Sequence, residues 1–425
     1  MQNPFGEYTP AGRTIVCSWA MRAESSSAGS RAGALLEVLG ASLKLGLTSF
    51  GGPIAHIGYL RDEYVVRRKW LREEAFADLV ALCQFLPGPA SSQVNISIGM
   101  SRAGIAGGLA AWLGFTLPSA AVLTAFAFLL GVNGVLDSGW LHGIMLAAVG
   151  VVAQAVAAMA ARYSADVKRG VMTAAAAILS LLIPSGITQV AVIVGGGIAG
   201  RLLLPAPVGR GQDALPLKVS RPVSLGALGL FLALLAGLPV LRTILDAQWL
   251  SVAESFYRTG SLVFGGGHVV LPLLHREVVL PGWVSDSRFM AGYAAAQAVP
   301  GPLFTFAAYL GAVMTAGPGG IGGALLALTA IFLPSFLLLI GVLPFWSALR
   351  GRPGFQSALA GVNAAVVGLL AAALYQPVWT GSVSSVPDFC VALGAFVLLT
   401  RVKAPPWAVV VLGAVVGEGA RFLSP

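Results

Sequence analysis

The stretch Lys44-Leu-Gly-Leu-Thr-Ser-Phe-Gly-Gly52 returns 214 residues later as Arg258-Thr-Gly-Ser-Leu-Val-Phe-Gly-Gly266. In both stretches a cation is followed by a glycine two residues on, then by a phenylalanine and a glycine pair. Self-similarity at a fixed offset is typical of a duplicated structural unit. The two stretches therefore predict a chain built from two copies of one unit.

The correspondence continues downstream of both stretches. The matching segments keep their order along the chain: Glu63 with Glu277, Gln84–Pro89 with Gln297–Pro302, and Pro118-Ser119 with Pro334-Ser335. The offset shifts by only one to three residues between these segments, so short insertions explain the slips. Duplication accounts for such an ordered series better than chance.

The composition indicates a membrane protein. Of 425 residues, 57% are hydrophobic and 10% are charged, whereas soluble domains carry about 25% charged residues. Apolar stretches near the roughly 20 residues needed to cross a bilayer recur, for example at 109–130, 143–161 and 225–241. The net charge of +9 lies mostly in short loops between apolar segments, which favours a lipid bilayer over nucleic acid as partner. We expect an all-α polytopic membrane protein.

The apolar segments divide the chain into four parts: a cytoplasmic tail at 1–32, a first repeat at 33–205, a basic linker with a connecting transmembrane helix at 206–248, and a second repeat at 249–425. They predict 12–13 transmembrane segments, with Lys and Arg concentrated in the loops assigned to the cytoplasm. The basic loop at 61–72 departs from that pattern, and its side stays open. Seven segments separate equivalent points of the copies, so we expect inverted repeats, a common design of secondary transporters.

Two cations lie at equivalent positions inside predicted spans, Lys44 and Arg258. A charged side chain at the bilayer centre costs about 2.5–3.5 kcal/mol on insertion scales, so such residues face a cavity or a partner. Two cations related by the repeat suit a dianion bound between the halves. The alternative is an ion pair on the same helix, with Glu37 beside Lys44 and Glu254 beside Arg258.

Each copy carries a glycine turn directly after its cation-bearing segment. Glycine allows the helix to end there, and consecutive N–H groups in such a turn form an anion-binding nest. The alternative is an ordinary loop at the membrane interface. The candidate ligands in these turns are Gly51 and Gly52 in the first copy, and Gly265, Gly266, Gly267 and His268 in the second.

A Pro-Gly-Pro triplet interrupts one apolar stretch in each copy, at 87–89 and 300–302. Proline lacks an N–H and clashes with the preceding turn, so each triplet must break its helix, and a new half-helix can start at the second proline. The N-terminus of a half-helix attracts an oxyanion through its free N–H groups and dipole. A purely structural kink is the alternative. The candidate ligands here are Gln84, Gly88, Pro89, Gln297, Gly301, Pro302 and Thr305.

Three further features complete the site predictions. Glu63 and Glu277 lie near the glycine turns, where a carboxylate could carry a proton during transport; solvated loop acids are the alternative. The four histidines and three cysteines have no metal-ligand or disulfide spacing, so we expect neither a metal nor a cofactor. Gly196-x-x-x-Gly200 predicts a helix-packing face.

In these features the chain resembles the long, two-domain form of the chromate ion transporter family. The resemblance covers nearly the whole chain from about residue 33, and its most specific motifs are Phe50–Pro53, Leu262–Leu274 and Gln297–Phe306. It implies a secondary transporter, not an enzyme, that exports chromate across the inner (cytoplasmic) membrane and confers chromate resistance.

The residues alone leave other functions open. Chromate and sulfate are both tetrahedral dianions, so sulfate uptake or sulfate–chromate exchange is the first alternative. A membrane-embedded reductase is the remote alternative, although no cysteine cluster or histidine pair for a redox cofactor is visible. Assembly into a homo-oligomer also stays open.

Overall fold

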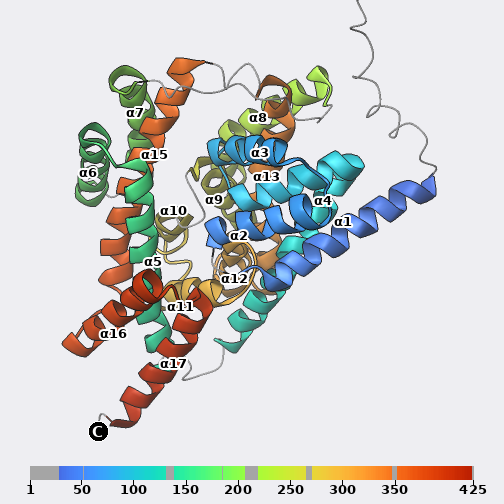
Figure 1. The fold of residues 1–425 in the computed structure, drawn as a ribbon. Coiled ribbons are helices and arrows are strands. Elements are labelled where there is room, and N and C mark those ends of the chain that lie inside the picture. The colour runs from blue at the N-terminus through green and yellow to red at the C-terminus, as the bar shows by residue number, and fades with distance from the viewer. Residues whose placement is uncertain are drawn as a thin grey trace, which may run out of the picture.

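The computed structural model describes residues 28–50, 52–130, 138–183, 185–205, 219–264, 270–346 and 352–423. Within these ranges the ordered elements are helices, and no β-strand occurs (Figure 1). The predicted all-α class is confirmed. A backbone in hydrocarbon must satisfy its own hydrogen bonds, and a helix does so within one segment.

The first copy is a series of helices with one π-helical turn. In chain order its elements are α1 (Ala28–Thr48), α2 (Gly52–Arg61), η2 (Asp62–Arg67), α3 (Glu73–Phe85), α4 (Ala90–Leu129), α5 (Gly139–Tyr163), α6 (Val167–Leu182) and α7 (Gly186–Leu203). The first helix begins inside the predicted tail, whose residues 1–27 lie outside the described ranges. A connecting helix, α8 (Arg221–Leu245), follows where the sequence predicts a connecting transmembrane segment.

The second copy repeats this order. Its α-helices are α9 (Gln248–Leu262), α10 (Val270–Val278), α11 (Asp286–Ala298), α12 (Phe306–Val313), α13 (Gly320–Val342), α15 (Pro353–Ala373), α16 (Val386–Val397) and α17 (Pro406–Leu423). Short 3-10 or π-helical elements join some of them: η4 (Leu303–Thr305), η5 (Leu343–Phe345), η6 (Leu374–Trp379) and η7 (Leu398–Val402).

Helix α4 is a hairpin of two arms. Its backbone leaves helical geometry at Gly104, where φ is +65°. The arms run side by side, because Asn95 Nδ2 donates to the Ala111 carbonyl oxygen at 2.9 Å. In the second copy α12 and α13 pack together in the same way. Each copy therefore contains a half-helix, 90–102 or 303–313, which is shorter than the roughly 20 residues of a full crossing.

Among the described residues, five helices have the length and composition of a membrane span: α4, α5, α8, α13 and α15 with η6. These helices confirm a multi-pass membrane protein. Three further apolar helices among the described residues are shorter, at 188–203, 303–313 and 406–420. Each Pro-Gly-Pro triplet lies between the end of one helix and the start of the next, so the predicted broken helices are confirmed.

The two copies interlock through their last helices. Helix α5 of the first copy packs against α16 and α17 of the second, and α15 packs against α6 and α7 (Figure 1). Both contacts depend on glycine: a Cβ added at Gly200 or at Gly417 would lie 2.7 Å from the Cα of Gly361 or of Gly143, respectively. The predicted packing face at Gly196 and Gly200 is confirmed. Close backbone approach at small residues is typical of helices that associate in lipid.

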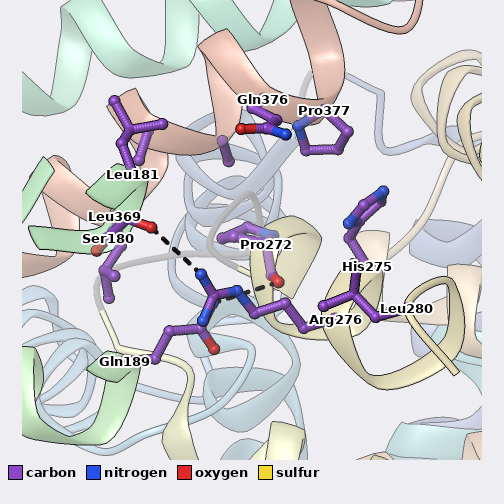
Figure 2. A pocket seen from close by; sticks show the side chains of 12 residues that line it. Ser180, Leu181, Gln189, Pro272, His275, Arg276, Leu280, Leu369, Gln376 and Pro377 are labelled. Carbon is purple, nitrogen blue, oxygen red and sulfur yellow. Dashed lines mark hydrogen bonds between the residues drawn. The ribbon is translucent and has the colours of Figure 1, made fainter. Parts of the chain in front are cut away.

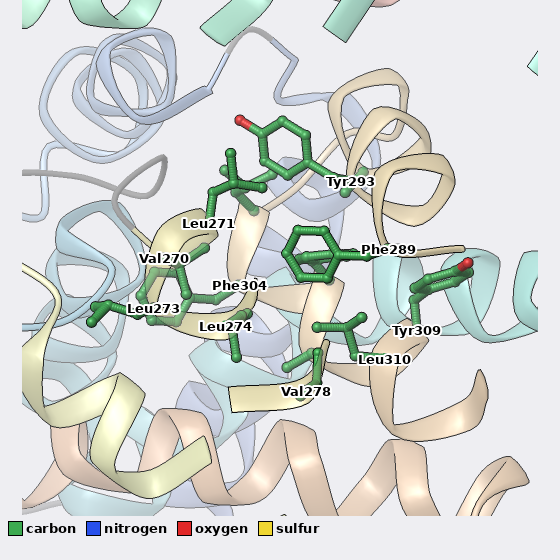
Figure 3. Packing of buried hydrophobic residues seen from close by; sticks show 14 of the residues in the cluster. Val270, Leu271, Leu273, Leu274, Val278, Phe289, Tyr293, Phe304, Tyr309 and Leu310 are labelled. Atoms are coloured by element: carbon green, nitrogen blue, oxygen red, sulfur yellow. The ribbon is translucent and has the colours of Figure 1, made fainter. Parts of the chain in front are cut away.

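A buried aromatic cluster surrounds the helix break of the second copy. Phe289 and Tyr293 of α11, Phe304 of η4 and Tyr309 of α12 lie among the aliphatic side chains of α10 (Figure 3). Phe289 meets Phe306 edge to face, with 5.1 Å between the ring centroids. Such aromatic pairs add about 0.5–1.5 kcal/mol to the gain from burial. This packing holds the start of the second half-helix in place.

Candidate functional site

Two backbone hydrogen bonds join the helix breaks of the two copies. The Gly88 N–H donates to the Val263 carbonyl oxygen at 2.7 Å, and the Gly301 N–H donates to the Ser49 carbonyl oxygen at 2.9 Å. Each bond links the Pro-Gly-Pro break of one copy to the end of the cation-bearing helix of the other. The bonded residues are equivalent in the repeat alignment, so the two bonds form a pseudo-symmetric pair. We call this place the crossing and define it as residues 49–50, 87–89, 263–264 and 300–302.

Glycine is required in the middle of each break. Gly88 and Gly301 have φ of +121° and +110°, a region that residues with a side chain rarely adopt. A Cβ at Gly301 would lie 2.7 Å from Ser119 Oγ, and a Cβ at Gly88 would press against Ser335 Oγ. Because Ser119 and Ser335 are themselves equivalent, the two breaks are built alike.

A half-helix begins on each side of the crossing. Helix α4 starts after Pro89 and η4 with α12 starts after Pro302, and no side chain caps either of these described starts. The first N–H groups of a helix lack intrahelical acceptors and form the positive end of its dipole. Ser91, Ser92 and Thr305 at these starts are buried. Two sets of backbone donors are therefore buried at the crossing, which suits an oxyanion.

Apart from Ser92, which directly follows the first break, the buried hydroxyl groups around the crossing are residues that the sequence interpretation missed. Ser49, Ser92, Thr116 and Ser335 are buried, and the hydroxyl oxygen of each bonds to none of the described residues. An unpaired polar group in an apolar interior costs about 1–3 kcal/mol, so such groups call for a ligand or water. The only signal in the sequence was the Pro-Ser pair that aligns between the copies and includes Ser335.

The predicted glutamine and threonine ligands differ in their placement. Gln297 is buried, whereas its equivalent Gln84 accepts a hydrogen bond from Arg162 at 3.0 Å near the surface. The Thr305 hydroxyl donates to the Pro302 carbonyl oxygen at 2.7 Å, so its proton is already used. In the described parts of the chain, no three His, Cys, Asp or Glu side chains gather as metal ligands.

The structure describes only part of the two glycine turns. Gly52 begins α2 with φ of +76°, which suits a turn. His56, four residues into α2, lies 3.4 Å through Nδ1 from Ser91 Oγ at the start of α4. The remaining turn residues predicted as ligands lie outside the described ranges: Gly51, Gly265, Gly266, Gly267 and His268.

Each predicted cation forms an ion pair within its own copy. Lys44 Nζ lies 2.7 Å from Glu63 Oε2, and Arg258 Nη2 lies 2.5 Å from Glu277 Oε2. Both acids are 19 residues downstream of their cations, so the pairs are equivalent. The structure thus brings each cation to an acid, although 49% of the Lys44 side chain and 36% of the Arg258 side chain stay exposed.

The alternative of a partner on the same helix holds for one of the two cations. Arg258 Nε lies 2.9 Å from Glu254 Oε1, one turn earlier on α9. Glu37 instead pairs with Arg68 at 3.2 Å and with Arg102 at 3.1 Å. The change of direction between α1 and α2 explains this difference, since it brings a later acid to the cation of α1.

The two equivalent acids differ in how firmly they are held ionised. Three cations donate to Glu63: Lys44, Arg67 and Arg68. Burial raises the pKa of Glu63, but these hydrogen bonds outweigh it and lower the pKa to about 2. For Glu277 burial is the largest influence, and the charge of Arg258 offsets only part of it, so the pKa lies above its ordinary value. Glu63 is held as an anion, whereas Glu277 binds a proton more readily than an ordinary glutamate does.

A cavity of about 390 Å³ lies beside the second ion pair. Arg258, Thr259 and Leu262 of α9, Glu277 of α10 and Gln189 of α7 line it, together with apolar side chains. The Thr259 hydroxyl oxygen is buried and has no hydrogen-bond partner among the described residues. The residue after Leu262 belongs to the crossing, so the cavity adjoins the crossing along α9.

A smaller cavity of about 80 Å³ shares Gln189 with the first (Figure 2). Here Arg276 donates to the Ser180 carbonyl oxygen at 3.3 Å and also to that of Ser185. Gln189 donates to the Pro272 carbonyl oxygen at 3.4 Å. Because backbone carbonyls occupy the guanidinium, Arg276 serves to hold α6 and α7 of the first copy against α10 of the second.

Comparison with known proteins gives several relatives along most of the chain. The probable chromate transport protein of Synechococcus elongatus is 28% identical over 390 residues, which cover 88% of this chain and 93% of the relative. The chromate transport protein of Pseudomonas aeruginosa is 30% identical over 335 residues, or 78% of each chain. That of Cupriavidus metallidurans is 27% identical over 379 residues, which cover 88% and 89%. No solved structure matches the chain.

The family comparison follows the duplication seen in the fold. A family model described as chromate transporter matches twice, at residues 36–201 and at 250–418. One match contains the Lys44–Glu63 pair and the break at Gly88, and the other contains their equivalents. The two matches together cover well over half of the sequence, and the chain therefore belongs to the chromate transporter family.

Proposed function

We propose that this protein is a secondary transporter that exports chromate across the cytoplasmic membrane and so confers chromate resistance. Two relatives named as chromate transport proteins and one named as a probable chromate transport protein match most of the chain. They support chromate as the substrate. The observation that carries the proposal is the crossing, where Gly88 and Gly301 join the broken helices of one copy to the other. In repeat-built transporters the substrate binds at such an interface, between discontinuous helices.

The dianion binds at the crossing. The half-helices after Pro89 and Pro302 provide backbone N–H groups, and buried hydroxyls such as Ser335 complete the donor set. Donors to an anion in a water-excluded site form charge-assisted hydrogen bonds, which are roughly twice as strong as neutral ones. Lys44 and Arg258 stay partly exposed beside their acids and balance the charge of the anion.

Transport follows from movement of one copy against the other around the crossing. The two copies lie in opposite orientations in the membrane, so the same movement opens the site first to one side and then to the other. Export of a dianion from a cell that is negative inside is favoured by about 2.3 kcal/mol per charge per 100 mV, so it needs no nucleotide. Of the two acids next to the cations, Glu277 is the one through which a proton would couple to transport, because Glu63 is held ionised by three cations.

Sulfate transport is the competing function, because sulfate has the same shape and charge as chromate and fits the same donors. Sulfate uptake runs against the membrane potential and would require protons or another ion to drive it. A reductase would consume chromate instead of moving it.

Labelled chromate and everted membrane vesicles test these functions together. We expect saturable, potential-driven accumulation, because the everted interior corresponds to the outside of the cell. Excess sulfate measures the preference between the two anions, and vesicles without the protein are the control. Absence of accumulation, or chromate reduction by the purified protein, would overturn the proposal.

Substitution at the crossing tests the site itself. Ser335→Ala removes a hydroxyl donor to the anion and should raise the KM for chromate roughly tenfold or more, since such a bond is worth about 1.5–3 kcal/mol. Ser101→Ala is the matched control, because the Ser101 hydroxyl donates to the Ile98 carbonyl oxygen away from the crossing. Lys44→Ala and Arg258→Ala should each lower the flux, and wild-type flux in both would exclude the two cations from the site.

A further inference from the structure

The Arg258–Glu277 pair forms part of the wall of the 390 Å³ cavity between α7, α9 and α10. The Arg258 side chain is 36% exposed and that of Glu277 is 17% exposed, so water can reach both. The other polar groups of the wall are Thr259 and Gln189. Because α9 leads from this cavity directly into the crossing, an anion that approaches along α9 meets the Arg258 guanidinium first.

The guanidinium of Arg258 is shared between two carboxylates that are held unequally. Glu254 is 2% exposed and accepts a second ion pair from Arg242 at 3.1 Å. In the described part of the chain, Glu277 forms an ion pair with Arg258 alone. Glu277 is therefore the carboxylate that can leave the guanidinium while Glu254 stays in place.

We propose that a tetrahedral oxyanion and the Glu277 carboxylate compete for Arg258, and that uptake of one proton by Glu277 admits the anion. This inference rests on the proposed function and names its coupling device. A proton from water binds the carboxylate, the ion pair breaks, and the anion forms charge-assisted hydrogen bonds to the freed guanidinium. Glu277 keeps this proton while the anion is bound. When the anion leaves the protein, Glu277 returns its proton to water and the ion pair forms again.

The charges around Glu277 favour this exchange. Burial raises its pKa, the charge of Arg258 and a hydrogen bond from Ser255 lower it, and the nearby Glu254 carboxylate raises it, so that the pKa stays above its ordinary value. Of the helices packed against α10, α7 contributes the neutral Gln189 and α15 has no charged residue between 353 and 373. Helix α11 contributes Asp286, whose carboxylate is paired with His275 of α10 at 2.7 Å. The neighbouring Arg276 of α10 itself is occupied by the carbonyls of Ser180 and Ser185.

The equivalent acid of the first copy is unsuited to the same role. Glu63 is 4% exposed, and three cations bring its pKa to about 2. It stays ionised at any pH near neutrality, so a proton cannot release Lys44. The two copies thus provide one exchangeable proton site instead of two.

The test is the pH dependence of the KM for chromate in vesicles that contain wild type, Glu277→Gln or Glu277→Asp. Linkage to one proton makes the wild-type KM rise by up to about tenfold per pH unit above the pKa of Glu277. Glu277→Gln should have a low KM without this rise, while Glu277→Asp, the matched conservative variant, should keep it. The protonation of chromate itself is the same in all three proteins, so only the difference between them counts.

A second measurement uses the wild-type protein alone. Calorimetry of chromate binding at pH 8, in two buffers of different ionisation enthalpy, should show uptake of about one proton per anion, as linkage requires; at this pH chromate carries no proton of its own. The same KM slope in Glu277→Gln as in wild type, or no proton uptake by wild type, would overturn the inference and leave chromate transport standing. Wild-type vesicles that carry no chromate would instead refute the proposed function.

Discussion

The two copies place the same ion pair at the same spacing and hold it differently. Lys44–Glu63 and Arg258–Glu277 both join residues 19 apart. In the first copy two further arginines hold the acid, so three cations share one carboxylate. In the second copy one arginine is divided between two carboxylates. Duplication has kept the positions of the charges and changed the ratio of cations to carboxylates. We call the first copy fixed, because its acid stays ionised, and the second copy adjustable, because its acid is held by a single shared arginine.

The same divergence occurs close by, between the second helix and the start of the third helix of each copy. Arg61 Nε lies 2.6 Å from Glu73 Oε1 in the first copy, and His275 Nε2 lies 2.7 Å from Asp286 Oδ1 in the second. Histidine is the side chain whose charge changes near neutral pH, whereas arginine stays charged. The second copy again carries the titratable version of a contact that is permanent in the first.

The backbone crossing is the part that the two copies share, and its loss should have the largest effect. Gly88→Ala and Gly301→Ala each force a side chain into a conformation suited to glycine, which costs about 1–3 kcal/mol, and press it against Ser335 or Ser119. Overpacking adds about 1–3 kcal/mol. Both variants should unfold at markedly lower temperature in detergent and should do so equally.

Gly394→Ala is the control for these two variants, because a Cβ there has no neighbour within 4 Å. A large fall in unfolding temperature for Gly88→Ala with none for Gly301→Ala would contradict the equivalence of the two breaks, since the crossing would then be needed in only one copy. Equal effects at both glycines would show that the shared backbone is required throughout.

The ion pairs should give the next largest effect, and it should be unequal. Glu63→Gln leaves Lys44 and two arginines without their common acceptor, a loss of about 1.5–3 kcal/mol, reduced because half of the Lys44 side chain reaches water. Glu277→Gln should cost less, because burial already disfavours the ionised form of Glu277 and raises its pKa. Thermal unfolding of the purified variants measures both, with the exposed Glu74→Gln as control.

The contribution of the Lys44–Glu63 pair to stability should also depend on pH, and it should persist until the solution is strongly acidic. The pKa of Glu63 is lowered to about 2 from about 4.3 in an unfolded chain. Its stabilisation is therefore complete above about pH 4.3 and is lost as the pH falls through about 2. If Glu277→Gln unfolds at a lower temperature than Glu63→Gln, the assignment of a fixed and an adjustable copy is wrong.

The features that could be predicted from the sequence are those with a local cause. Proline and glycine act on the backbone whatever surrounds them, so the breaks at Gly88 and Gly301 follow from their triplets alone. The packing face at Gly196 and Gly200 follows from the spacing of small residues in an apolar helix. The repeat can be recognised without a structure, because the matching motifs of the two copies align directly in the sequence.

The features that could not be predicted depend on what the fold brings together. Helical periodicity suggests partners three or four residues away, whereas Lys44 meets an acid 19 residues downstream. The packing of the last helices of each copy against those of the other could not be predicted, because the sequence of an apolar helix says little about which neighbour it faces. Only the glycines of those helices mark it, and Gly143 and Gly361 are 218 residues apart, beyond the aligned motifs. Burial of Ser335 was equally invisible.

The His275–Asp286 contact of the second copy should have the smallest effect on stability, but the direction of its pH dependence is clearly predicted. Burial lowers the pKa of His275, and Asp286 offsets only part of it, so the folded protein binds this proton more weakly than an unfolded chain with a pKa of about 6.5. Stability should fall as the pH drops below about 6.5, by about 1 kcal/mol or less for a pair in which Asp286 is 60% exposed. The difference in unfolding temperature between pH 5.5 and 7.5 should shrink in His275→Gln and stay unchanged in Arg61→Gln. A wild-type protein that gains stability on acidification through His275 would show that Asp286 outweighs burial, and the second copy would then hold this contact as firmly as the first.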